Sequence, residues 1–191
     1  RATMKRYLEE QKFVERTGFV YLERTIGSHV RRGLMACLDL EQYDFSKGST
    51  SPIRATEGTI LERIPPRVKI REGATIELPH IMVLIDDPDD TVLGPLRHPG
   101  GAPLYDIELM LGSGTLRGHL VDDPALEAGV VRAIEALPAG FAARCGVPTM
   151  TPPLLYAMGD GNHSLATAKT IWERAKERGT PLDSRLRYAL V

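Results

Sequence analysis

The chain has 191 residues, of which 42% are hydrophobic and 26% are charged, and its formal net charge is −1. This length and composition are ordinary for a globular protein, and because no linker or repeat is visible, we expect residues 1–191 to form a single domain, excised from a longer chain. The neutral total gives no support for a broadly basic surface, so nucleic-acid binding is not expected within this segment. No apolar run approaches the roughly 18 residues of a membrane span. Two distant cysteines without metal-ligand spacing favour a reducing, cytoplasmic setting with no membrane partner.

The first third of the chain predicts a short helix and then an antiparallel hairpin. Residues 3–18 carry spaced apolar side chains among charges before a glycine, which is typical of a helix. Residues 19–26 and 32–40 are strand-like runs on either side of the turn segment GSHVRR. The second run is apolar on both faces around residues 34–37, so we expect its strand to be central in a sheet.

The middle of the chain alternates turn-rich and apolar segments. Within residues 41–67, Thr56 is expected to cap a short helix that Pro65 and Pro66 end. Residues 78–88 are expected to form a buried strand that runs into a turn. Farther on, the strand-like runs PLYDIELML and TLRGHLVDD flank the turn GSG and predict a second hairpin.

The C-terminal part predicts two helices and a strand between them. Residues 123–140 are amphipathic, and Pro138 is expected to end that helix. LLYAM is then a strand, and apolar residues spaced by three and four indicate a helix from about Asn162 to Arg178, with Trp172 buried. Because helices interleave with strands that are joined by short turns, the predicted fold class is α+β, a mixed sheet flanked by helices, and not a doubly wound parallel sheet.

Polar chemistry gathers where this strand meets this helix, in the sequence GDGNHSLATAK, residues 159–169. A glycine-containing turn that enters a helix leaves free backbone N–H groups and lets a ligand come close, and the helix dipole adds partial positive charge. The corner is therefore a candidate anion site. Asn162, His163 and Ser164 add hydrogen-bond donors. Asp160 would serve such a site by meeting a metal ion, a ligand hydroxyl or His163.

The same spacing fits an ordinary helix start about equally well. Gly161 can shape the turn, Asp160 or Asn162 can cap the helix, and His163 can be exposed in the first turn. The segment is not a Walker loop, because the six-residue spacing and the Lys-Ser/Thr ending are missing, and it is not a GxGxxG loop.

A second polar cluster lies at another predicted loop-to-helix entry and contains Arg54, Thr56, Glu57, Thr59 and Arg63. Its ordinary interpretation is a capped helix with solvated charges. We predict instead that the two clusters share one site. Glu57 would then lie across from the turn at residues 161–164, and at least one of Arg54, Arg63 and Arg67 would face the same cleft.

The other histidines and the serines carry no further motif. No two of the five histidines have metal-ligand spacing, and His98 lies in a Pro/Gly loop, so no resident metal site is predicted. No serine lies in a G-x-S-x-G turn, which argues against an α/β-hydrolase.

Three segments resemble one family. GDGNHSLATAK, placed after a strand, resembles the DGHHR…A signature of domain-of-unknown-function family 1015, and GLMACLDLEQYDF and IRATEGTILERIPPRVKIRE resemble that family's middle region. Members are often labelled as similar to ParB partition proteins. The resemblance, which spans the chain from about FVYLER to RYALV, implies a ParB/sulfiredoxin-like fold in which a strand–turn–helix corner holds nucleotide phosphates.

The resemblance also implies roles for individual residues. Asp160, Gly161 and His163 match D-G-x-H, and Ser164 stands where many relatives have arginine. This departure removes a fixed positive charge and a bidentate donor, so Arg54, Arg63 or Arg67 would have to supply the charge instead. By similarity to an ADP-dependent serine kinase of the same fold class, Glu57 is the candidate general base, on its loop position alone.

Three functional hypotheses follow. The first is a nucleotide- or phosphate-binding enzyme, a candidate small-molecule kinase that uses ADP or ATP with Mg. Its catalytic residues would be Glu57, Asp160 and His163, and its phosphate-binding residues Gly161, Asn162, His163, Ser164, Arg54 and Arg63. The second is a ParB-like nucleotide switch or DNA-associated binding module. The third is a non-catalytic interaction domain. The partner expected under the first hypothesis is a nucleotide or a phosphorylated small molecule.

Overall fold

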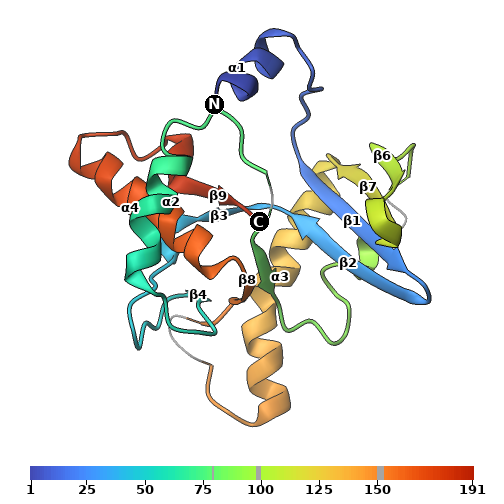
Figure 1. Cartoon of the computed structure of the whole chain (residues 1–191). Helices are drawn as coiled ribbons and strands as arrows, with labels where there is room; N and C mark the ends of the chain where they lie inside the picture. Colours follow the sequence, from blue (N-terminus) through green and yellow to red (C-terminus); the bar gives the residue numbers. More distant parts are fainter. Residues whose placement is uncertain (79, 98–99, 150–152) are drawn as a thin grey trace. The chain divides into compact units, whose positions relative to one another are not determined.

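The computed structural model describes residues 1–78, 80–97, 100–149 and 153–191. The chain folds into two compact units, and each is assembled from segments that are distant in sequence (Figure 1). Unit 1 comprises residues 1–14, 37–85 and 138–191, and unit 2 comprises residues 15–36 and 86–137. This division does not test whether residues 1–191 behave as one domain, which stays a prediction. His98 lies outside the described residues.

Unit 1 contains two small sheets and the helices α1 (Ala2–Glu9), α2 (Ile64–Arg71) and α4 (Asn162–Glu177). The larger sheet has the order β4 (Ile53–Arg54), β8 (Tyr156–Asp160), β5 (Met82–Leu84), with β4 parallel and β5 antiparallel to β8. The smaller sheet pairs β3 (Cys37–Asp39) with β9 (Tyr188–Leu190). Short 3-10 helices span Leu40–Gln42, Leu61–Arg63 and Arg185–Arg187.

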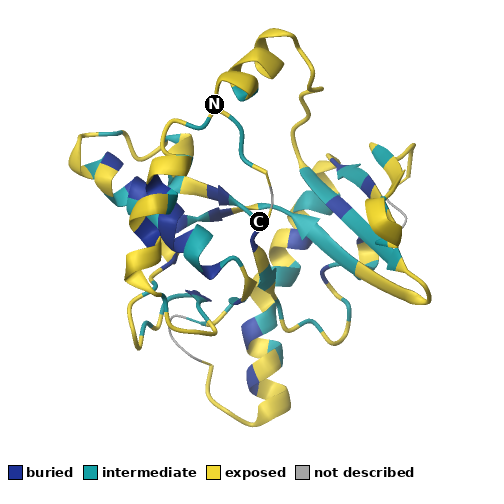
Figure 2. Ribbon diagram, in the orientation of Figure 1, coloured by how far each residue is buried: buried dark blue, intermediate teal, exposed yellow. Residues whose placement is uncertain are grey.

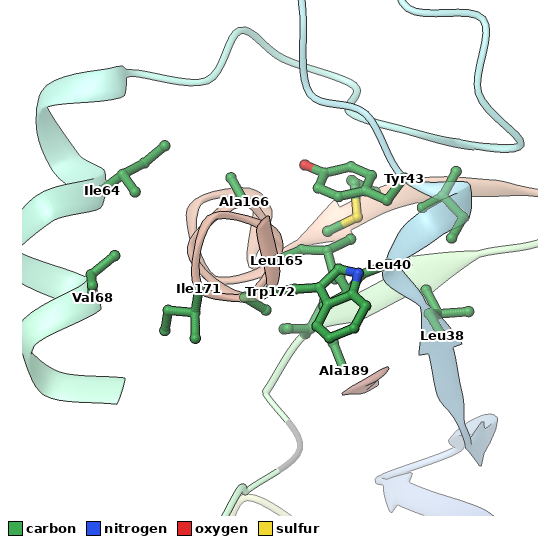
Figure 3. Packing of buried hydrophobic residues seen from close by; sticks show 14 of the residues in the cluster. Leu38, Leu40, Tyr43, Ile64, Val68, Leu165, Ala166, Ile171, Trp172 and Ala189 are labelled. Atoms are coloured by element: carbon green, nitrogen blue, oxygen red, sulfur yellow. The ribbon is translucent and has the colours of Figure 1, made fainter. Parts of the chain in front are cut away.

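The core of unit 1 forms around α4, where the buried residues gather in Figure 2. The predicted helical face is buried along its whole length, and it consists of Leu165, Ala168, Trp172 and Ala175. Trp172 has 0% exposure, as predicted. In Figure 3, Ile64 and Val68 of α2 lie beside α4, against which that helix packs. The helix therefore forms because its apolar stripe is covered on more than one side, and not from helix propensity alone.

Unit 2 is a four-stranded antiparallel sheet in the order β2 (His29–Met35), β1 (Phe19–Ile26), β7 (Thr115–Val121), β6 (Tyr105–Glu108). Both predicted hairpins are confirmed. Helix α3 (Pro124–Cys145) follows β7, and its residues from Pro138 onward belong to unit 1. The unit also holds the 3-10 helices Gly94–Leu96 and Met110–Gly112. The predicted α+β fold class, a mixed sheet with flanking helices, is confirmed, and the mixed sheet is β4–β8–β5.

Two predictions about strands are wrong. β2 lies at the edge of its sheet and not at its centre, because the chain leaves this sheet after Met35 and residues 37–39 pair with β9 instead. The strand expected within residues 78–88 forms, but as an exposed edge strand, in which Met82 is 40% exposed and Leu84 is 53% exposed.

Two predictions about prolines are also wrong. Pro65 and Pro66 begin α2 where they were expected to end a helix, because the first helical positions need no backbone N–H donor and suit the fixed φ of proline. Pro138 lies inside α3, which continues for seven more residues to Cys145. A proline removes one backbone hydrogen bond from a helix, and here the turns on either side of it continue without that bond.

Candidate functional site

One residue, Gly161, joins β8 to α4. Its backbone is left-handed, with φ 83° and ψ 19°, and a Cβ atom at this position would lie 2.9 Å from Cα of Ile81. Backbone conformation and close packing thus both require glycine here. Gly159 is an ordinary strand residue, and its Cβ position would lie 3.3 Å from the carbonyl oxygen of Met82. The space that both glycines provide is filled by the segment that includes β5, whereas the sequence argument assigned it to a ligand.

The first turn of α4 closes on Gly161 itself. The amides of Ser164 and Leu165 donate to the Gly161 carbonyl at 2.9 Å and 3.0 Å. The backbone N–H of Ser164 is therefore not available to a ligand, although its side chain is not used in this turn. Asp160 does not cap the helix, because its Oδ1 accepts from the Gly161 amide at 2.7 Å. One oxygen of this exposed carboxylate is thus already engaged in the turn.

Two amides remain at the helix start. No side chain caps α4, and among the described residues the backbone N–H groups of Asn162 and His163 have no acceptor. Both amides lie at the positive end of a 16-residue helix, where an anion is stabilised. Because Asn162 is only 4% exposed, an anion would approach from the side of His163.

The side chain of Asn162 is buried and makes three hydrogen bonds, and it does not cap the helix. Its Oδ1 accepts from the Tyr43 hydroxyl at 3.4 Å and from Thr59 Oγ1 at 3.3 Å, and its Nδ2 donates to the carbonyl of Glu57 at 3.4 Å. Burial raises the pKa of Tyr43, so its hydroxyl stays a neutral donor. The helix start is thereby tied to two other segments of unit 1.

Segment 56–60 docks on the corner through further contacts. Thr56 Oγ1 donates to the carbonyl of Met158 in β8 at 2.8 Å. The prediction that this hydroxyl caps a helix is therefore wrong. The Ile60 amide donates to Nε2 of His163 at 3.1 Å. The structure thus brings the two polar clusters together, and the imidazole is held at the corner and is not free in the first turn. Glu57 lies in this segment with its side chain exposed.

Two of the three candidate arginines, Arg54 and Arg67, contact backbone close to themselves. Arg54 donates from Nε to the carbonyl of Ser51 and from Nη2 to that of Thr50, both at 2.8 Å. Arg67 Nη1 donates to the carbonyl of Arg63 at 2.9 Å, and Arg63 itself is exposed in a 3-10 helix. These contacts join both guanidinium groups to backbone within four residues of themselves.

The described residues contain neither a metal-binding cluster nor a membrane-spanning helix. Within them, no group of three or more His, Cys, Asp and Glu side chains is placed to hold a metal ion. No helix in that part of the chain has the length and apolar character needed to cross a bilayer.

A family model described as protein of unknown function, DUF1015, matches residues 1–191. The chain belongs to the DUF1015 family. The membership inferred from GDGNHSLATAK is therefore confirmed, over the whole chain. No curated protein and no solved structure matches this DUF1015 chain.

Two residues that contact the DUF1015 corner, Tyr43 and Ile60, were not predicted from the sequence. Tyr43 lies 119 residues before Asn162, and no motif links the two. Ile60 acts through its backbone N–H, which has no residue signature at all. By contrast, the polar cluster around Thr59 was visible in the sequence, and its proximity to the corner was predicted.

Proposed function

We propose that this chain binds the phosphate groups of a nucleotide or a phosphorylated small molecule at the start of α4. The observation that carries the proposal is the uncapped helix start, where the amides of Asn162 and His163 have no acceptor among the described residues. Backbone donors at the positive end of a helix suit phosphate oxygens. The ring of His163, held beside these amides, adds a side-chain donor.

The proposed chemistry is phosphoryl transfer from ADP or ATP with Mg on a ParB/sulfiredoxin-like corner. Glu57, exposed in the segment docked on Asn162, would accept the proton of the acceptor hydroxyl as its oxygen bonds to phosphorus. The bond from phosphorus to the nucleotide oxygen breaks, and the shortened nucleotide leaves. Asp160 fits a magnesium ion or the acceptor hydroxyl through the carboxylate oxygen that the Gly161 amide does not use. Such catalysis relies on positioning and charge neutralisation.

Ser164 supports a second candidate, a non-catalytic nucleotide-switch or interaction domain. A serine at this position supplies no fixed positive charge, and Arg54 and Arg67 donate to backbone carbonyls of their own segments. Charge neutralisation is central to phosphoryl transfer and less essential to binding. Both candidates place the protein in the cytoplasm, in keeping with two free cysteines.

Calorimetric titration with ADP, ATP and CTP, each with magnesium, tests the proposal. His163→Ala should weaken binding by about 1.5–3 kcal/mol, because a donor to a charged oxygen is lost. Ser164→Arg should strengthen binding, because it adds a bidentate cationic donor. His29→Ala, at an exposed position of unit 2, is the matched control and should change nothing. The absence of any heat or thermal shift at millimolar nucleotide would overturn the proposal.

A further inference from the structure

We infer that the backbone N–H of Ile60 sets the tautomer of His163, so that the imidazole carries its proton on Nδ1. The Ile60 amide donates to Nε2 at 3.1 Å. A ring nitrogen that accepts a hydrogen bond carries no proton, so the neutral ring must carry its proton on the other nitrogen. Ile60 is thereby a positioning residue for the proposed phosphate site.

The contact is held by the segment around it and does not depend on the exposed side chain of Ile60. Thr59 bonds to Asn162 Oδ1, and the Glu57 carbonyl accepts from Asn162 Nδ2. The Arg63 amide donates to the Ile60 carbonyl at 3.1 Å, which fixes the peptide unit that follows Ile60. The amide of residue 60 therefore points at the ring from a segment that is fastened on both sides.

The tautomer determines which nitrogen can serve a ligand. The His163 side chain is partly exposed, and its Nδ1 is not among the buried side-chain atoms of the described residues that lack a hydrogen-bond partner. This nitrogen is bonded directly to Cγ, so it lies closer to the residue's own backbone than Nε2 does. This step rests on the proposed function. In it, the Nδ1–H group of the neutral ring donates to an anionic phosphate oxygen, next to the amides of Asn162 and His163 that have no acceptor.

The test combines a tautomer measurement with a pair of variants at one position. Long-range ¹H–¹⁵N correlation spectra of ¹⁵N-histidine-labelled protein, recorded near pH 8 where histidine is ordinarily neutral, identify the protonated nitrogen. Ile60→Pro removes the N–H group and suits the native φ of −81°. Ile60→Ala keeps the N–H and removes only a side chain that is 44% exposed. Far-UV circular dichroism checks that both variants fold.

We expect the Nδ1–H pattern for His163 in the wild type and in Ile60→Ala, and a mixture of tautomers in Ile60→Pro. An Nε2–H pattern in the wild type, or an unchanged pattern in Ile60→Pro, would overturn the inference. In titrations with Mg·ADP, Ile60→Pro should bind about tenfold more weakly and Ile60→Ala like the wild type. If no protein binds Mg·ADP while the wild type shows Nδ1–H, the proposed function fails and the tautomer assignment stands.

Discussion

The corner of unit 1 and the sheet of unit 2 satisfy their polar side chains in different ways. In unit 1, Asn162 is a buried amide whose partners come from segments distant in sequence. In unit 2, opposite charges pair across neighbouring strands. The strand register places Asp106, Arg117, Glu23 and Arg32 in one row, with charges that alternate from strand to strand.

This difference explains why the functional proposal concerns unit 1. In this row, Arg117 and Asp106 form an ion pair 2.6 Å apart that is about half exposed, and Arg32 pairs with Asp90 of the same unit. Such pairs contribute little stability and offer a ligand no surplus of one charge. At the start of α4 the donors outnumber their acceptors, because the side chains that could cap the helix are engaged elsewhere. The mismatch, and not the number of polar residues, marks the candidate site.

The largest effect is expected from Gly161→Ala, which tests whether unit 1 depends on its corner. The new methyl group would meet Ile81 at 2.9 Å on a left-handed backbone, and we expect a loss of about 2–4 kcal/mol in the free energy of unfolding. Gly58→Ala is the matched control in the docked segment, since its Cβ position has no neighbour within 4 Å. Urea unfolding followed by Trp172 fluorescence measures both. Equal stabilities of the two variants would contradict the prediction.

Asn162→Ala comes next and bears directly on the comparison. It leaves the buried Tyr43 hydroxyl without its acceptor and the Glu57 carbonyl without its donor, which should cost about 2–3 kcal/mol. Arg117→Ala in unit 2 is the control. Asp106, the partner of Arg117, is about half exposed, so water can hydrate its carboxylate when the arginine is removed. Chemical unfolding of both variants gives the ranking. A loss in Arg117→Ala as large as that in Asn162→Ala would remove the distinction between the units.

The sequence predicted best where a local pattern decides the outcome. The +3, +4, +3 spacing from Leu165 to Ala175 located α4 and its buried face, and turn residues located both hairpins. The strand before α4 was expected at LLYAM and is found two residues later, because pairing with β5 sets its end and spacing does not.

Other features depend on contacts that a single sequence does not contain. Whether β2 is central or at an edge is decided by which strand pairs beside it, and apolar composition alone misplaced it. Pro65 signals a helix boundary, but its residue type does not say which boundary. At the site, the polar residues of the corner were identified from sequence, whereas Tyr43 and the amide of Ile60 reach it only through tertiary structure.

A smaller, pH-dependent effect tests whether the two units unfold together. Hydrogen bonds from Arg187 lower the pKa of Asp39 in unit 1, and hydrogen bonds from Arg32 lower the pKa of Asp90 in unit 2. Because the folded pKa lies below the unfolded value of about 3.9, the stabilisation is present above that pH. It is lost as the pH falls through the folded pKa.

Replacing each aspartate by asparagine should therefore flatten the acid loss of stability between about pH 5 and pH 2. Trp172, the single tryptophan, reports on unit 1. If residues 1–191 are one cooperative domain, as predicted, Asp90→Asn should flatten the curve seen by Trp172 fluorescence as Asp39→Asn does. A Trp172 curve that responds to Asp39→Asn alone would show two separate domains.

The smallest effect concerns the left-handed backbone conformation, which is adopted by a glycine in unit 1 and by a leucine in unit 2. Gly161 of unit 1 is left-handed and tightly packed, whereas Leu111 of unit 2 has φ 59° and is 96% exposed. Leucine is strained there by about 1–2 kcal/mol, and glycine has an entropy cost of about 0.5–1 kcal/mol, so Leu111→Gly should stabilise the protein by about 0.5 kcal/mol. Met110→Gly, beside it and 82% exposed, should destabilise by a similar amount because Met110 is not left-handed. Thermal and urea unfolding should therefore give changes in the free energy of unfolding of opposite sign for Leu111→Gly and Met110→Gly. A loss of stability in both variants would show that the turn does not strain Leu111.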